Sequence, residues 1–139
     1  MLTLGPGVCI VLSTPRWPLI MATALGAIGV MAGAFGAHAL RDEVSVRYLA
    51  IWETAAHYQL VHALALLALA VGMQSVQWLQ NSTLALWSAR LFALGTVIFS
   101  GSLYALVLSG QGVLGAITPI GGSLLITAWA LLGIAAYRR

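Results

Sequence analysis

Residues Trp52–His62 read WETAAHYQLVH and combine an acid, a tyrosine, a glutamine and two of the chain's three histidines. The stretch opens an apolar run that continues to about Met73. Polar side chains are scarce elsewhere in the chain. Those in this stretch must therefore find partners or water, because an unpaired polar group in an apolar medium is costly. We expect the rest of the chain to be arranged around this stretch.

The amino-acid composition indicates a membrane protein. The chain has 139 residues, of which 61% are hydrophobic and only 6% charged, and its mean hydropathy is +1.00. A soluble domain carries about 25% charged residues because its surface must face water. We therefore expect lipid to surround most of the surface of this protein.

The charges and the single cysteine exclude several kinds of site. The six basic residues are all arginine and are scattered, and the net charge is only +3, so we expect no nucleic-acid partner. Cys9 is the only cysteine, which rules out an internal disulfide and a thiolate metal site.

Four apolar segments are long enough to cross a membrane as helices. A spanning helix needs about 20 apolar residues, since it rises about 1.5 Å per residue. We predict an all-α membrane protein with a single four-transmembrane-helix bundle over residues 16–139. The predicted spans are about residues 19–40, 54–73, 88–108 and 116–137.

The first 15 residues are not expected to form a further span. They are apolar, but Gly5, Pro6, Gly7 and Pro15 interrupt them. No basic residues precede this run, as a secretory signal would require. We interpret residues 1–15 as a dispensable N-terminal extension, and a short targeting or interfacial segment is the alternative.

Glycines recur along the first predicted span. Gly26, Gly29, Gly33 and Gly36 are spaced three, four and three residues apart, which is the spacing of one helix face. Membrane helices associate through close packing of small residues, because lipid is as apolar as leucine. We expect this face to contact either another span or another copy of the chain.

The distribution of arginines suggests an orientation in the membrane. Arg41, Asp42, Glu43 and Arg47 form a charged connection after the first span, where we expect a short surface helix with local ion pairs. Four spans place both termini on one side. That side carries four arginines against two on the other, so the positive-inside rule favours cytoplasmic termini. The four are Arg16, Arg90, Arg138 and Arg139.

Three polar residues are expected at the membrane edge opposite the termini. His38 ends the first span, and Glu53 and His57 share a face of the second because they are four residues apart. A Glu and two His are possible zinc or iron ligands. Their spacing matches no known metal motif, so we expect a structural clasp between the two spans and no metal.

His62 and Tyr58 share another side of the second span. His62 lies on the order of 10 Å below the membrane edge opposite the termini. We predict a hydrogen bond from His62 to a hydroxyl of the third span, holding the two spans together. A proton or ligand site is the alternative. A lone histidine is weak support for haem, and the many small residues favour close packing, so we expect no cofactor. The candidate hydroxyls are Ser100, Ser102 and Tyr104.

Four motifs resemble those of one family of small membrane proteins. They are Gly33–Leu40 (GAFGAHAL), Trp52–Leu64 (WETAAHYQLVHAL), Phe99–Tyr104 (FSGSLY) and Leu114–Gly122 (LGAITPIGG), in that order within residues 16–137. The family is typified by YgdD and YwdK and catalogued as domain of unknown function 423. The resemblance implies a four-helix protein of the inner membrane and supplies no activity.

The family motifs coincide with the polar and glycine positions already singled out. No catalytic or ligand role is attached to them in the family. Gly121 and Gly122 join the expected helix-packing residues. The coinciding positions are His38, His62, Ser100, Ser102, Tyr104, Thr118, Pro119, Gly121 and Gly122.

Three hypotheses for function follow. The leading one is a non-enzymatic accessory or assembly subunit that acts through helix contacts in a larger membrane complex or a homo-oligomer, surrounded by membrane lipids. The second is a small oligomeric transporter or channel that uses His62. The third is an enzyme, for which Ser100 with His62 is the only conceivable pair. No acid lies at their depth, so we expect no enzymatic activity.

Overall fold

The computed structural model describes residues 15–139, and the expected N-terminal extension lies, but for Pro15, outside them. The described part of the chain contains helices and no strand, which confirms the all-α fold class. Four helices are long and the others are short connecting turns. The elements are α1 (Trp17–Phe35), the π-helical turn η1 (Gly36–Leu40), α2 (Val46–Ser75), α3 (Gln77–Gln80), α4 (Thr83–Ser109), the 3-10 turn η2 (Gly112–Ala116) and α5 (Thr118–Tyr137).

Four segments are long and apolar enough to cross a membrane, which confirms the predicted number of spans. The second segment starts at Val46, earlier than predicted. Ser45 caps it by accepting a hydrogen bond from the backbone N–H of Tyr48 at 3.3 Å. At about 1.5 Å per residue α2 is about 45 Å long, so its first turns reach beyond the hydrocarbon. Hydropathy detects only the part inside the hydrocarbon.

The expected surface helix between the first two spans is absent, so this prediction is wrong. Residues 41–44 form a tight turn, in which the carbonyl of Leu40 accepts from the N–H groups of Glu43 and Val44 at 3.1 Å each. Arg47 belongs to the first turn of α2. Because Ser45 starts the next helix at once, too few residues remain for a separate one.

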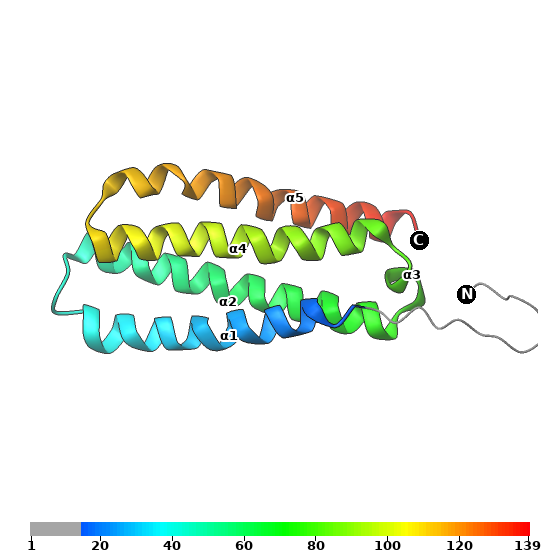
Figure 1. The fold of residues 1–139 in the computed structure, drawn as a ribbon, viewed down its shortest axis with the longest axis horizontal. Helices are drawn as coiled ribbons and strands as arrows, with labels where there is room; N and C mark the ends of the chain where they lie inside the picture. Colours follow the sequence, from blue (N-terminus) through cyan, green and yellow to red (C-terminus); the bar gives the residue numbers. More distant parts are fainter. Residues whose placement is uncertain (1–14) are drawn as a thin grey trace, which may run out of the picture.

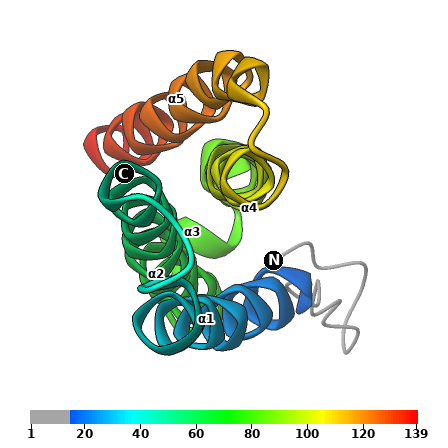
Figure 2. The same ribbon diagram turned by 90° about the vertical axis from the view of Figure 1, so that its left-hand side faces the viewer.

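The four long helices run side by side with alternating direction, and the start of α1 and the end of α5 lie at the same end of the bundle (Figure 1). Viewed along the helices, they form an open row rather than a closed ring (Figure 2). α1 packs mainly on α2, α2 on α4, and α4 on α5. α2 and α4 are therefore the inner helices, and each of the outer helices has one main neighbour.

Burial follows this arrangement. About 44% of the apolar windows of α2 and α4 is buried, against 22% for α1 and α5. Phe92 of α4 and Leu66 of α2 are fully buried at the centre of the larger apolar cluster. The outer faces of α1 and α5 expose Ile20, Met31, Ile126 and other large apolar side chains, as expected for contact with lipid.

Candidate functional site

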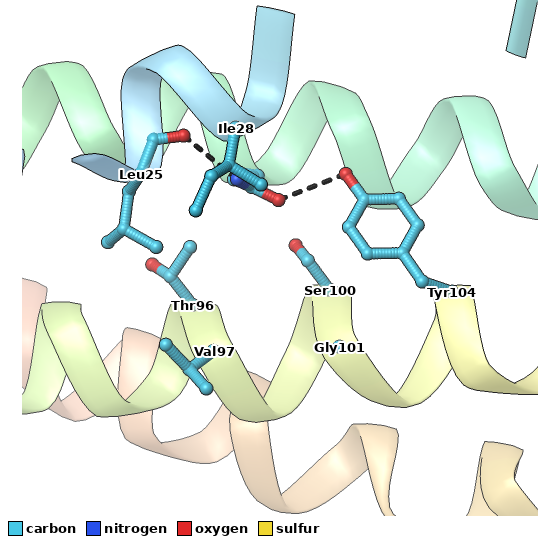
Figure 3. Close-up of a pocket in the computed structure, with 8 residues that line it drawn as sticks. Leu25, Ile28, Thr96, Val97, Ser100, Gly101 and Tyr104 are labelled. Carbon is cyan, nitrogen blue, oxygen red and sulfur yellow. Dashed lines mark hydrogen bonds between the residues drawn. The ribbon is translucent and has the colours of Figure 1, made fainter. Parts of the chain in front are cut away.

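Gln59 connects three helices through its side-chain amide. Its Nε2 donates to the carbonyl of Leu25 on α1 at 2.8 Å, and its Oε1 accepts from the hydroxyl of Tyr104 on α4 at 3.0 Å (Figure 3). The side chain is only 3% exposed. A buried amide in an apolar medium must satisfy its donors and acceptor, and here it does so by bridging neighbours on both sides of α2.

Trp52 forms a second link between α1 and α2. Its indole Nε1 donates to the carbonyl of Ala32 at 2.7 Å, and its ring packs on those of Phe35 and Tyr104 with centroid distances of 5.5 and 4.5 Å. A Cβ built on Gly36 would lie 2.6 Å from Cδ1 of this indole. Gly36 therefore provides the space that Trp52 fills.

Two serines of α4 bond to backbone carbonyls of the helices on either side. Ser100 donates to Ala55 of α2 at 2.8 Å, and Ser88 donates to Ala128 of α5 at 2.8 Å. Both serines are buried. Each hydroxyl thus supplies an interhelical hydrogen bond, and such bonds are among the few forces that hold helices together in lipid.

α4 and α5 approach each other closely in the half of the bundle near their connection. The hydroxyls of Ser102 and Thr118 are 2.8 Å apart. A Cβ on Gly121 would lie 2.4 Å from the backbone nitrogen of Phe99, whereas one on Gly122 would be at 3.8 Å from the Phe99 ring, an ordinary contact. Backbone meets backbone at Gly121, so only glycine fits there.

The glycine face of α1 divides into two stripes. Gly29 contacts Leu60, with a built Cβ 2.8 Å from its Cδ2, and Gly36 contacts Trp52. A Cβ on Gly26 or Gly33 would meet no neighbour within 4 Å in the part of the chain that the structure describes. The spacing predicted a single packing face. In the structure, Gly29 and Gly36 pack against α2, whereas Gly26 and Gly33 form a second stripe that is open.

His38, Glu53 and His57 do not come together. All three are exposed, and residues 15–139 contain no cluster of three or more His, Cys, Asp or Glu side chains that could hold a metal ion. The expected convergence at one edge is wrong. Since α2 starts at Val46, Glu53 lies about 10 Å along the helix, while His38 stays near the end of its span.

His62 is buried, with 7% of its surface exposed, but it does not bond to the third span as predicted. Its Nδ1 lies 2.7 Å from the carbonyl of Tyr58, one turn earlier in α2. Two of the candidate hydroxyls donate to other groups: Ser100 to the carbonyl of Ala55, and Tyr104 to the side-chain amide of Gln59. The side chain instead faces aromatic rings of α4 and α5.

Gln59, Trp52 and Ser88 form interhelical bonds that the sequence did not predict. Gln59 and Trp52 both belong to the stretch Trp52–His62, and a glutamine within an apolar span is a signal that could have identified Gln59. Ser88 lay at the predicted start of a span and carried no such signal. Within residues 15–139, no buried side-chain nitrogen or oxygen lacks a partner.

A groove of about 190 Å³ lies between α1 and α4, and Gln59 of α2 is one of the residues that line it (Figure 3). Val97 also lines a wider groove of about 480 Å³ toward the termini, where the guanidinium of Arg90 stacks 4.8 Å above the Trp87 ring. The chemistry of these grooves suits acyl chains more than a polar substrate. The narrower groove is lined by Leu25, Ile28, Gln59, Thr96, Val97, Ser100, Gly101 and Tyr104.

Residues 32–122 match a family described as "Protein of unknown function (DUF423)". The chain belongs to this family. These residues include Trp52, Gln59, Ser100 and Tyr104 and so contain most of the interhelical bonds. The resemblance found in the four sequence motifs is therefore confirmed.

Relatives in the DUF423 family carry membrane-protein names. The chain is 45% identical to a UPF0382 membrane protein of Staphylococcus aureus over 82% of this chain and 93% of the relative. It is 42% identical to the UPF0382 inner membrane protein YgdD of Escherichia coli over 90% of this chain and 92% of the relative. No solved structure matches the chain. This DUF423 chain is thus a multi-pass membrane protein.

Proposed function

We propose that this protein is a non-enzymatic accessory subunit that associates with another membrane helix through the open stripe of α1. The stripe consists of Gly26, Val30 and Gly33 of α1 and Ala37 of the adjoining turn η1, spaced four, three and four residues apart. The observation that carries the proposal is that Gly26 and Gly33 meet no neighbour among the described residues, although Gly29 and Gly36 on the adjoining stripe are tightly packed.

Glycine has two opposing effects on a helix in lipid. Glycine lowers helix stability by roughly 1 kcal/mol relative to alanine. Its benefit is that another backbone can approach closely, which favours association where lipid provides no hydrophobic driving force. Gly29 and Gly36 allow close packing within the bundle. The stripe with Gly26 and Gly33 is suited to close packing against a helix from outside the bundle. That helix belongs to a larger complex or to a second copy of the chain.

The hydrogen bonds that the buried polar groups form agree with a non-enzymatic role. The only candidate catalytic pair, Ser100 and His62, is not paired: Ser100 donates to Ala55, and His62 lies against Tyr58. Each buried hydroxyl or amide links helices or bonds within its own helix. These groups stabilise a scaffold, and acyl chains of surrounding lipid fill the groove between α1 and α4.

The test is native purification in mild detergent with size analysis on native gels. We expect the wild-type protein to migrate as part of a larger assembly, and Gly26→Leu with Gly33→Leu to release it as a folded monomer. Gly101→Leu is the matched control, because a Cβ at Gly101 also meets no neighbour yet lies on α4. A wild-type protein that is monomeric and without a partner would overturn the proposal.

A small oligomeric transporter or channel is the second candidate. One observation favours it: His62 is an ionisable side chain near the middle of a membrane span. Proton or substrate flux into liposomes would be measured for the wild type and for His62→Ala. Loss of a measurable flux in the variant supports this candidate, and absence of flux in the wild type rejects it.

A further inference from the structure

His62 lies near the middle of α2 (Val46–Ser75), on the order of 20 Å from either end of the helix. His62 therefore lies at the depth of the hydrocarbon core and not at the depth of the headgroups. Only molecules that dissolve in the hydrocarbon, or other membrane helices, reach a side chain at this position. This side chain lies on α2 and is not part of the open stripe of α1.

The hydrogen bond of Nδ1 determines what the other ring nitrogen can do. Nδ1 lies 2.7 Å from the carbonyl oxygen of Tyr58, and a carbonyl can only accept. Nδ1 therefore carries the proton of the neutral ring, and Nε2 presents a lone pair. Nε2 is left as a hydrogen-bond acceptor at the centre of the membrane.

Nε2 has no hydrogen-bond partner among residues 15–139. Every fully buried side-chain nitrogen in that range is paired, so this unpaired atom must reach the surface of the bundle although the residue is 93% buried. An unpaired acceptor in hydrocarbon is unfavourable. A donor from outside the chain would remove that cost.

Three aromatic rings lie beside the imidazole that carries this acceptor. Tyr58 stacks on the imidazole with ring centroids 5.7 Å apart, and Phe92 and Trp129 lie at 6.0 and 6.5 Å. Tyr58 on α2 and Trp129 on α5 are 42% and 49% exposed, so both also face the lipid. A flat ring that approaches His62 from the membrane finds aromatic surfaces beside it.

We propose that His62, Tyr58 and Trp129 form a binding site for a lipid-soluble aromatic alcohol of the quinol class. The ligand's hydroxyl donates to Nε2 of His62, and its ring packs against Tyr58 and Trp129. The site selects the reduced over the oxidised form. A quinol carries hydroxyl donors, whereas a quinone carries only acceptors, which the lone pair of Nε2 repels.

The test uses the full chain in lipid nanodiscs with ¹⁵N-labelled histidine. In nuclear magnetic resonance spectra without ligand, we expect His62 to show a protonated Nδ1 and an unprotonated Nε2. Decylubiquinol should shift the Nε2 resonance and bind about fivefold more tightly than decylubiquinone, the value of one ordinary hydrogen bond. Farnesol, which has a hydroxyl but no ring, should bind more weakly than the quinol.

Two variants separate the hydrogen bond from the rings. His62→Phe keeps an aromatic ring and should abolish the preference for the reduced form. Trp129→Leu lies on the lipid-facing surface and should weaken quinol binding while the preference remains. His38→Phe is the matched control, because His38 is exposed at the far end of its span, and it should bind like the wild type.

Four outcomes would overturn the proposal. They are a proton on Nε2 in the empty nanodisc, equal binding of quinol and quinone, farnesol binding as tightly as the quinol, and an Nε2 resonance that depends on protein concentration without ligand. The last would show that a second copy of the chain fills the position. None of these results bears on the association tested through Gly26 and Gly33, so the two proposals fail separately.

Discussion

The hydroxyl of Tyr104 donates a hydrogen bond of 3.0 Å to the side-chain amide oxygen of Gln59, although 45 positions separate the two residues in the sequence. The same amide donates to the carbonyl of Leu25 at 2.8 Å. One glutamine thus joins α1 and α4 through α2. In hydrocarbon, hydrogen bonds of this kind and close packing are what hold helices together.

Removing the two partners of this hydrogen bond should have unequal effects on stability. Tyr104→Phe deletes one interhelical bond and should lower the free energy of unfolding by about 0.6 kcal/mol. Gln59→Leu deletes two and should cost about 1–2 kcal/mol. Unfolding by dodecyl sulfate in mixed micelles measures both. In the double variant the two losses should not add, and full additivity would show that the bond contributes nothing.

Gly36→Ala should destabilise the protein by about 1–3 kcal/mol, because the added methyl overlaps the Trp52 indole and forces the side chain or the helix to move. The built Cβ is 2.6 Å from Cδ1 of Trp52. Gly33→Ala, on the open stripe, is the control and should leave the stability of the isolated chain unchanged or slightly higher. Equal effects of the two substitutions in thermal unfolding in detergent would refute the division into two stripes.

Gly121→Ala should be more damaging than Gly122→Ala. A Cβ at Gly121 would lie 2.4 Å from the backbone nitrogen of Phe99, and backbone cannot move aside as a flexible side chain can. At Gly122 the nearest atoms are 3.8 Å away. We expect a loss of about 2–3 kcal/mol for the first and little change for the second. Yield and melting temperature of the purified variants provide the comparison.

The bond between Ser88 and the carbonyl of Ala128 should contribute to the contact between α4 and α5. Ser88→Ala should cost about 0.5–1.5 kcal/mol, since an interhelical bond is lost. Ser123→Ala is the matched control, because Ser123 is exposed and its hydroxyl donates to the carbonyl of Pro119 in its own helix. The same unfolding assay applies, and a control as destabilised as Ser88→Ala would contradict this prediction.

The arginine distribution predicts that both termini face the cytoplasm. Asp42→Cys and Arg139→Cys, each in a Cys9→Ala background, place one thiol at each end of the bundle. A membrane-impermeant maleimide added to intact cells or spheroplasts should label Asp42→Cys and should label Arg139→Cys only after lysis. The opposite pattern would reverse the orientation and leave the fold unaffected.

The number and nature of the helices could be predicted because both depend on local composition. An apolar run of sufficient length forms a helix in lipid whatever its neighbours are. The start of α2 could not be placed in the same way. Arg47 and Glu53 lower the hydropathy, yet they continue the helix from its cap at Ser45. Because α2 starts earlier than predicted, Glu53 lies away from His38, and His62 lies near the middle of the helix.

The sequence by itself determined that this chain is a membrane protein with four helices long and apolar enough to span the lipid, and that those helices carry few polar groups. Only the tertiary structure decided which of those groups meet: Gln59 with Tyr104, Ser100 with Ala55, and His62 with aromatic rings instead of hydroxyls. Such pairings depend on the rotation and axial shift of one helix against another. A difference of one turn changes the depth of a side chain by about 5 Å, and no local pattern of residues specifies it.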